Sequence, residues 1–157
     1  MDEIDLRILA LIQQDSSISM AAIADRVGLS PSPCWRRIER LQANGVIQRR
    51  VALLDPRKIN VGVTVFVNIR TSQHSAAWAE HFCREVSRVP EIVEFYRMSG
   101  TYDYLLKAVV PDISYYDAVY KRITSIAELL DVTSSFAMEQ LKYTTSLPLS
   151  YAVIEPR

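Results

Sequence analysis

The apolar residues in the first third of the chain recur every three or four positions, the spacing of an α-helix that buries one face. Stripes of this kind run through residues 2–13, 18–29 and 31–41. In the third stripe, Cys34, Ile38 and Leu41 form the apolar side, and arginines lie off it. The pattern predicts three short helices packed around a small core.

Serine, proline and glycine mark the ends of the second and third helices. Ser19 and Ser30 stand at N-cap positions, where a serine hydroxyl accepts a hydrogen bond from a free backbone N–H of the first turn. Pro31 takes the first helical position, where its missing N–H costs nothing. Gly28 ends the second helix, because glycine readily adopts the positive φ of a helix C-terminus. Two short helices joined by a tight turn are typical of a helix-turn-helix.

The residues that follow the third helix predict an extended segment and a boundary. Residues 46–54 read as a strand, which we expect to form a small wing or to link two domains, and Asp55-Pro56 ends it. The chain therefore divides into a winged helix-turn-helix domain over 1–54, a linker over 55–60 and a second domain over 61–157.

From residue 61 the pattern changes to β-rich runs that alternate with amphipathic helices. Strands are predicted over 61–70, 92–98, 102–110 and within 130–143, and helices over 75–88 and 112–126. This β-α-β-β-α-β order is that of a ferredoxin-like fold, so the expected class is α+β. In the second of these helices, the residues expected to face inward are Ile113, Tyr116, Val119, Tyr120 and Ile123. Phe66 lies on the strand face away from the helices, which suggests a homodimer through the open sheet faces.

Basic residues are concentrated around the third helix. The whole chain balances 18 Lys and Arg against 18 Asp and Glu. Residues 26–58 nevertheless carry eight basic and two acidic side chains, a net charge of +6. Taken singly, each arginine is most simply a solvated surface residue. Together on and after a short helix they indicate a double-stranded DNA partner.

The predicted DNA contacts fall into two groups. The first group lies on the third helix, where Trp35 is expected to pack on the backbone or groove wall. This group comprises Ser30, Ser32, Trp35, Arg36, Arg37 and Arg40. Phosphate contacts, which position the protein without reading sequence, are expected from Arg49, Arg50 and Lys58.

A glycine turn between two predicted strands is a candidate ligand loop. Gly100 lets a ligand approach the main chain, whose N–H groups can hold a carboxylate. Asp103 can accept from an amino group, and Ser134 and Ser135 can add hydroxyls, so the set suits an amino-acid zwitterion. The simpler alternative is a hairpin in which Asp103 satisfies the backbone of the turn.

Several functional classes find little support in the chain. No apolar run reaches the roughly 18 residues of a membrane span, and the acidic N-terminus lacks a signal-peptide core. Cys34 and Cys83 are too far apart to indicate a disulfide framework, which favours the cytoplasm. No metal-ligand spacing, nucleophile–base pair or phosphate loop is evident, so neither a cofactor nor an enzyme is expected. The alternatives are an enzyme on a ferredoxin-like scaffold and a winged-helix protein-interaction module.

The chain resembles the Lrp/AsnC family of transcription regulators from Asp2 to about Leu149. The segments that carry the resemblance are Val27–Cys34, Arg37–Leu41, Ala52–Pro56, Ser99–Lys107 and Val110–Asp112. The resemblance implies a DNA-binding regulator that forms dimers and octamers and binds an amino-acid effector between C-terminal domains. It implies effector contacts in the turn region, at Arg97, Ser99, Gly100 and Asp103, and on two strands, at Val65, Ser135, Phe136 and Ala137. Thr101 and Tyr102 in the same turn, together with Ser134, complete the candidate effector residues.

Two positions depart from the leucine-responsive members of the family. Arg97 stands where those members have an apolar side chain, and Ser135 stands where they have a tyrosine. A small or polar amino acid is therefore expected as effector. Residues 131–140 resemble a cysteine-responsive subgroup, which makes cysteine one candidate.

Overall fold

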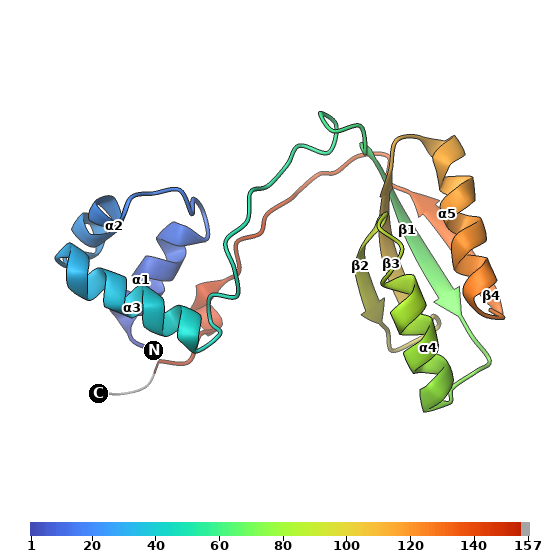
Figure 1. Cartoon of the computed structure of the whole chain (residues 1–157), viewed down its shortest axis with the longest axis horizontal. Coiled ribbons are helices and arrows are strands. Elements are labelled where there is room, and N and C mark those ends of the chain that lie inside the picture. Colours follow the sequence, from blue (N-terminus) through green and yellow to red (C-terminus); the bar gives the residue numbers. More distant parts are fainter. Residues whose placement is uncertain (155–157) are drawn as a thin grey trace. The chain divides into compact units, whose positions relative to one another are not determined.

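A computed structural model describes residues 1–154, which fall into two compact units (Figure 1). The first unit combines Met1–Ala52 with the C-terminal segment that begins at Leu141, and the second is Leu53–Gln140. The predicted second domain, 61–157, therefore extends too far. Leu149 packs against the core of the first unit, and the Gln13 amide donates to the Leu147 carbonyl at 3.2 Å and accepts from its N–H at 2.9 Å. The two hydrogen bonds join residues 134 positions apart, a contact that the spacing of apolar residues cannot reveal.

Three α-helices build the first unit: α1 (Glu3–Ile12), α2 (Met20–Val27) and α3 (Pro31–Ala43). Its C-terminal segment adds one turn of 3-10 helix, η1 (Leu149–Tyr151). The Ser19 hydroxyl caps α2 by accepting from the Ala22 N–H, and Gly28 ends that helix at φ +73°, as predicted. Ser30 occupies the N-cap of α3, but its side chain makes no capping hydrogen bond, so that detail of the prediction is wrong. The predicted stripe of α3 is buried in a core with residues of α1 and α2.

The strand expected over 46–54 does not form. Within residues 1–154 this stretch pairs with no strand and runs on from α3 with its apolar side chains, such as Val51 and Leu54, exposed. The Ile47 N–H bonds back to the Leu41 carbonyl at 3.1 Å, which ties only the start of the stretch to α3. A strand needs a partner edge, and none of the described segments supplies one.

The second unit has the predicted element order. Its elements are β1 (Val63–Arg70), α4 (Ala76–Val86), β2 (Ile92–Arg97), β3 (Tyr104–Val110), α5 (Ile113–Ile126) and β4 (Asp131–Phe136). The strands form one sheet in the order β2-β3-β1-β4, with every neighbouring pair antiparallel. This is the ferredoxin-like topology, and the predicted α+β class is confirmed.

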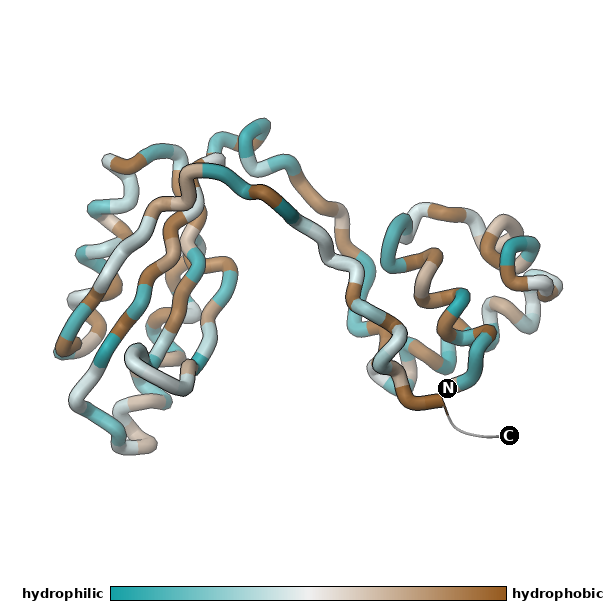
Figure 2. Tube along the Cα trace, turned by 180° about the vertical axis from the view of Figure 1, so that it is seen from behind, coloured by the Kyte–Doolittle hydropathy of each residue, from teal (hydrophilic) through white to brown (hydrophobic). Residues whose placement is uncertain are grey.

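The two faces of this sheet differ in character. Val65, Val67 and Ile69 are completely buried in a core shared with α4 and α5, whereas Phe66 is 38% exposed on the other face. In Figure 2 the strands of this sheet show apolar stretches interrupted by hydrophilic positions. On α5, Ile113 and Tyr120 are exposed, contrary to expectation. The buried stripe of α5 consists of Tyr116, Val119 and Ile123, so it begins one turn later and is narrower than predicted.

Candidate nucleic-acid interface and effector loop

The solvent-facing side of α3 is set by the burial of its opposite side. Because Cys34, Ile38 and Leu41 enter the core, the side chains at 32, 35, 36 and 39 face solvent. Trp35 is 52% exposed, which is unusual for so large an apolar side chain on a folded helix. Ser32 and Arg36 share this side with Trp35, as predicted for residues that enter a DNA groove.

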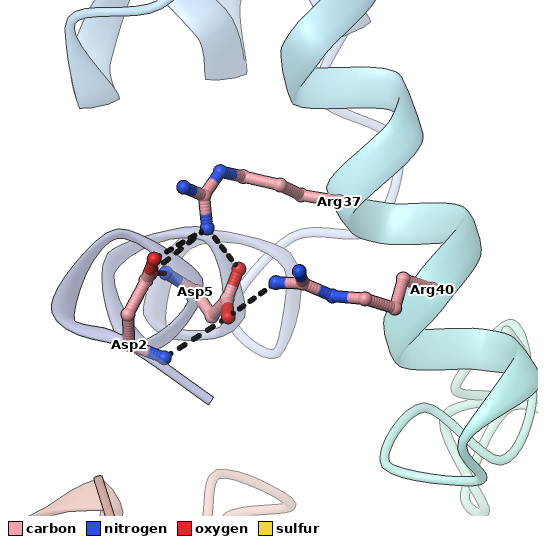
Figure 3. A network of polar contacts seen from close by, with 4 residues as sticks. All are labelled: Asp2, Asp5, Arg37 and Arg40. Carbon is pink, nitrogen blue, oxygen red and sulfur yellow. Dashed lines mark hydrogen bonds and ion pairs between the residues drawn. The ribbon is translucent and has the colours of Figure 1, made fainter. Parts of the chain in front are cut away.

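The other two arginines of α3 turn toward α1 (Figure 3). Arg37 donates through Nη1 to both carboxylate oxygens of Asp2, at 2.9 and 2.8 Å, and to Oδ1 of Asp5 at 2.8 Å. Arg40 donates through Nη2 to Oδ2 of Asp5 at 2.8 Å. We call these four residues the Asp–Arg cluster. The sequence interpretation placed both arginines on the DNA, whereas the structure gives each an intramolecular carboxylate partner.

The Asp–Arg cluster lies at the edge of the first core. The Asp5 side chain is completely buried, whereas the side chain of Arg37 is 21% exposed and that of Arg40 is 54% exposed. Burial acts to raise the pKa of Asp2, but hydrogen bonds from the Asp5 N–H and from Arg37 outweigh it and lower that pKa. Hydrogen bonds to Asp5 and Asp2 raise the pKa of Arg37. Arg37 and Asp2 thus each stabilise the ionised form of the other.

The predicted phosphate contacts lie outside the regular elements. Arg49 and Arg50 follow α3 in the extended stretch of the first unit, and Lys58 lies in a turn of the second unit. All three are exposed. Ser30 is also exposed, at the N-cap of α3.

The predicted effector loop joins β2 to β3 and is braced against β1. Gly100 has φ +129°, a conformation that other residues rarely adopt. The Met98 N–H donates to the Asp103 carbonyl, and the Asp103 N–H donates to the Ile69 carbonyl, both at 2.8 Å. The Asp103 carboxylate accepts from the Thr71 N–H, also at 2.8 Å. Asp103 therefore satisfies backbone groups of the turn, as in the simpler hairpin interpretation. Ser99, Gly100 and Thr101 are exposed, and Tyr102 is half-buried.

The second predicted group of effector residues lies around β4. Phe136 pairs in register with the buried Val65, Ser135 pairs with Phe66, and the Ala137 N–H donates to the Thr64 carbonyl at 2.9 Å. The Ser134 hydroxyl forms a hydrogen bond of 2.6 Å with the Tyr116 hydroxyl of α5.

One chain does not bring these two groups together. The loop ends beside Ile69, whose partner on β3 is Tyr104, whereas Phe136 pairs with Val65. Four residue steps along β1 separate the levels of Ile69 and Phe136, a distance of about 13 Å, whereas Ser134, which pairs with Val67, lies two steps from Ile69. In addition, β3 and β4 flank β1 on opposite sides. A single amino acid is too small to touch both the loop and Phe136 of one chain.

Arg97 lies at a cleft that the sequence did not reveal. This hollow of ≈ 280 Å³ is lined by α4, β2 and β3 through Ala79, Glu80, Cys83, Phe95, Arg97 and Tyr104. Its volume lies just below the range of about 300–1,000 Å³ that is usual for small-molecule sites. Burial raises the pKa of the Tyr104 phenol, which keeps it neutral. Strand and helix periodicity placed these residues on separate elements without indicating that they meet.

No metal-binding group of three or more His, Cys, Asp or Glu side chains occurs within residues 1–154. Over the same residues, no helix is both long and apolar enough to cross a bilayer.

A helix-turn-helix unit joined to a ferredoxin-like unit is the arrangement of a two-domain DNA-binding regulator. A family model for a winged helix-turn-helix DNA-binding domain matches residues 1–48, and one for the Lrp/AsnC ligand binding domain matches residues 64–147. The chain belongs to the Lrp/AsnC family of transcription regulators.

Individual relatives agree with this assignment over the full chain. The DNA-binding transcriptional activator DecR of Escherichia coli is 51% identical over 150 residues, which cover 95% of this chain and 99% of DecR. The crystal structure of an AsnC family transcriptional regulator from Agrobacterium tumefaciens is 58% identical, with a TM-score of 0.95 over 98% of this chain and 100% of that one. A regulator from Neisseria meningitidis, solved as a complex with L-Met, is 32% identical, with a TM-score of 0.91 over 98% of this chain and 99% of its own.

Proposed function

We propose that the solvent-facing side of α3 enters the major groove and reads bases through Ser32 and Arg36, with Trp35 packing on the backbone or groove wall. The observation that carries this proposal is the exposure of Arg36 and Trp35 on the side of α3 opposite its buried stripe. Arginine pairs bidentately with guanine, and such a pair contributes about 1–3 kcal/mol of discrimination. Arg49, Arg50 and Lys58 contact phosphates, and Ser30 lies at the helix end that approaches the backbone. Arg37 and Arg40 orient α3 through the Asp–Arg cluster.

We further propose that an amino-acid effector binds at the loop of residues 97–103 and that a second chain completes the site. The separation of about 13 Å along β1 between the loop and Phe136 supports this arrangement, because Phe136 can reach a ligand at the loop only from another copy. The L-Met complex of the Neisseria relative supports an amino acid as the ligand class. Cysteine, the octamer and a cytoplasmic location stay predictions.

The same reasoning favours a homodimer through the open face of the sheet. That face carries the half-exposed Phe66 between polar neighbours, and Lys107 donates to Glu94 across it at 2.6 Å. The Lys107 side chain is only 18% exposed although no helix covers it. An isologous contact through this face buries Phe66 and yields two DNA-reading units per assembly.

The experiment compares binding to the upstream DNA of the protein's own gene with binding to random DNA over a series of salt concentrations. Arg36→Ala is expected to weaken binding to the specific DNA by about 5- to 150-fold and to change random-DNA binding far less. Arg50→Ala is expected to weaken both alike and to flatten the salt slope by about one unit. The matched control is Arg88→Ala, an exposed arginine after α4 in the second unit, which is expected to change neither. Equal losses on both DNAs in Arg36→Ala would contradict the proposed reading side.

The effector proposal is tested in the same assay by adding each common amino acid in turn. If one amino acid changes the DNA affinity of the wild type and Asp103→Asn abolishes that change, the result supports the loop as the effector site. A response that survives in Asp103→Asn, or no response to any amino acid, contradicts the proposed effector site and leaves the DNA-binding proposal unaffected.

A further inference from the structure

Asp5 is the most constrained acidic residue of the first unit. Its side chain is completely buried, and both of its carboxylate oxygens accept hydrogen bonds: Oδ1 from Arg37, and Oδ2 from Arg40 and from the Asp2 N–H. A buried carboxylate is tolerated only when cations and hydrogen bonds compensate its lost hydration. The two arginines of α3 supply that compensation (Figure 3).

The position of the two carboxylates is set by α1 and does not depend on α3. Asp2 is the N-cap of α1, its side chain accepts from the Asp5 N–H at 3.0 Å, and the Asp5 side chain accepts in return from the Asp2 N–H at 3.0 Å. This reciprocal capping box fixes both side chains at the start of the helix. The guanidinium groups of Arg37 and Arg40 therefore meet anions whose place is already defined.

DNA phosphates compete for the same guanidinium groups. An arginine that pairs with phosphate releases a counterion and adds affinity for any sequence, whereas one held by a protein carboxylate contributes neither. The Asp–Arg cluster combines two positive and two negative side chains, so it cancels two of the three arginine charges of α3. Arg36, on the exposed side of the helix, is not part of the cluster.

We propose that Asp2 and Asp5 act as internal counter-anions that withhold Arg37 and Arg40 from DNA phosphates, and so set the ratio of specific to non-specific DNA binding. The inference rests on the proposed function, because it requires α3 to be the DNA-contacting helix. Asp5 is thereby a positioning and specificity-determining residue that need not touch DNA. Its carboxylate fixes the orientation of α3 and keeps sequence-independent affinity low.

The decisive variant is Asp5→Asn, which preserves the size of the side chain and removes its charge. The matched control is Asp25→Asn on α2, which makes the same charge change at an exposed site of the same unit. Each protein is titrated with upstream and with random DNA over a series of salt concentrations, and its melting temperature is recorded. Folded fractions at the assay temperature then correct the affinities for any loss of stability.

Asp5→Asn is expected to steepen the salt slope on random DNA by up to about two units, one for each released arginine. At about 0.15 M salt this corresponds to random-DNA binding that is about ten- to thirtyfold tighter. The specific-to-random ratio is expected to fall as well, because α3 loses the contacts that fix its orientation, so the specific complex gains less than the random one. Asp25→Asn is expected to leave the slope within about half a unit of the wild type. If Asp5→Asn does not fold, Asp2→Asn is expected to shift the slope in the same direction by up to about one unit, because Arg37 loses one of its two partners.

The outcomes separate the inference from the function on which it rests. An unchanged slope and ratio in the folded variant, with only a lower melting temperature, would overturn the inference and give Asp5 a purely structural role. A change of equal size in Asp25→Asn would overturn it as well, because general charge would then explain the effect. Failure of the wild type to prefer upstream over random DNA would instead reject the proposed function.

Discussion

Asp103 has two roles to separate, since its carboxylate braces the loop in the structure and is also the proposed partner of an effector ammonium group. The Asp103 carboxylate accepts from the Thr71 N–H at 2.8 Å, and Thr71 itself is buried. A hydrogen bond to a charged group contributes about 1.5–3 kcal/mol, and removing the acceptor also leaves a backbone N–H without its partner. Because Asp103 is half-buried, the lower figure applies.

Asp103→Ala is therefore expected to lower the free energy of unfolding of the second unit by about 1.5 kcal/mol. For a domain of this size, that loss corresponds to a melting temperature about 6–12 °C lower. Asp103→Asn keeps an oxygen that can accept from the Thr71 N–H, so it is expected to lose less than half as much. The matched control is Asp117→Asn, which breaks an exposed ion pair with Lys121 on α5 and is expected to cost about 0.5 kcal/mol or less.

The assay is thermal and urea unfolding of the four proteins, followed by the amino-acid panel on the folded ones. A melting temperature unchanged in Asp103→Ala would refute the bracing role. Equal losses of stability in Asp103→Ala and Asp103→Asn would show that the charge matters and not merely the acceptor. Only Asp103→Asn tests the effector contact cleanly, because the alanine variant disturbs the loop at the same time.

Three further changes have defined outcomes. Phe82→Ala removes a completely buried ring that stacks on Trp78 at 5.0 Å, and is expected to cost about 3–5 kcal/mol in urea unfolding. Acidification is expected to destabilise the first unit, because the pKa of Asp2 is lower in the folded protein than its unfolded value near 3.8. The stability that ionised Asp2 contributes is complete above that unfolded pKa and is lost as the pH falls through the folded pKa. The melting temperature of Asp2→Asn should therefore depend less on pH below about 4 than that of the wild type. Gly100→Ala forces a β-carbon onto φ +129° and is expected to cost about 1–3 kcal/mol, measured by thermal unfolding.

Local patterns predicted much of the fold because local chemistry determines those parts. Ser19 and Gly28 begin and end α2 through their own hydrogen bond and φ angle. The alternation along β1 predicted its buried face, since successive side chains of a strand point to opposite faces. The β-α-β-β-α-β order of the elements then predicted the ferredoxin-like topology, which the strand order β2-β3-β1-β4 confirms.

The parts that the sequence did not predict depend on contacts between distant residues. Helical spacing placed Arg37 off the apolar stripe of α3, but it carries no information on Asp2 and Asp5, which lie more than 30 positions away. The same limit applies to Leu149, which packs on the first core from the far end of the chain, and to the cleft beside Arg97. The strand expected over 46–54 has suitable residues but no partner edge among the described segments.

The central claim is that the protein is a regulator that binds DNA sequence-specifically through α3, as a symmetric assembly. Hydroxyl-radical footprinting of the upstream DNA, beside a scrambled sequence of equal composition, tests it most directly. The account predicts protection of two half-sites whose centres lie about 10 base pairs or a multiple of that apart, on one side of the helix, weakened in Arg36→Ala. Protection of the upstream DNA no stronger than that of the scrambled sequence would contradict it.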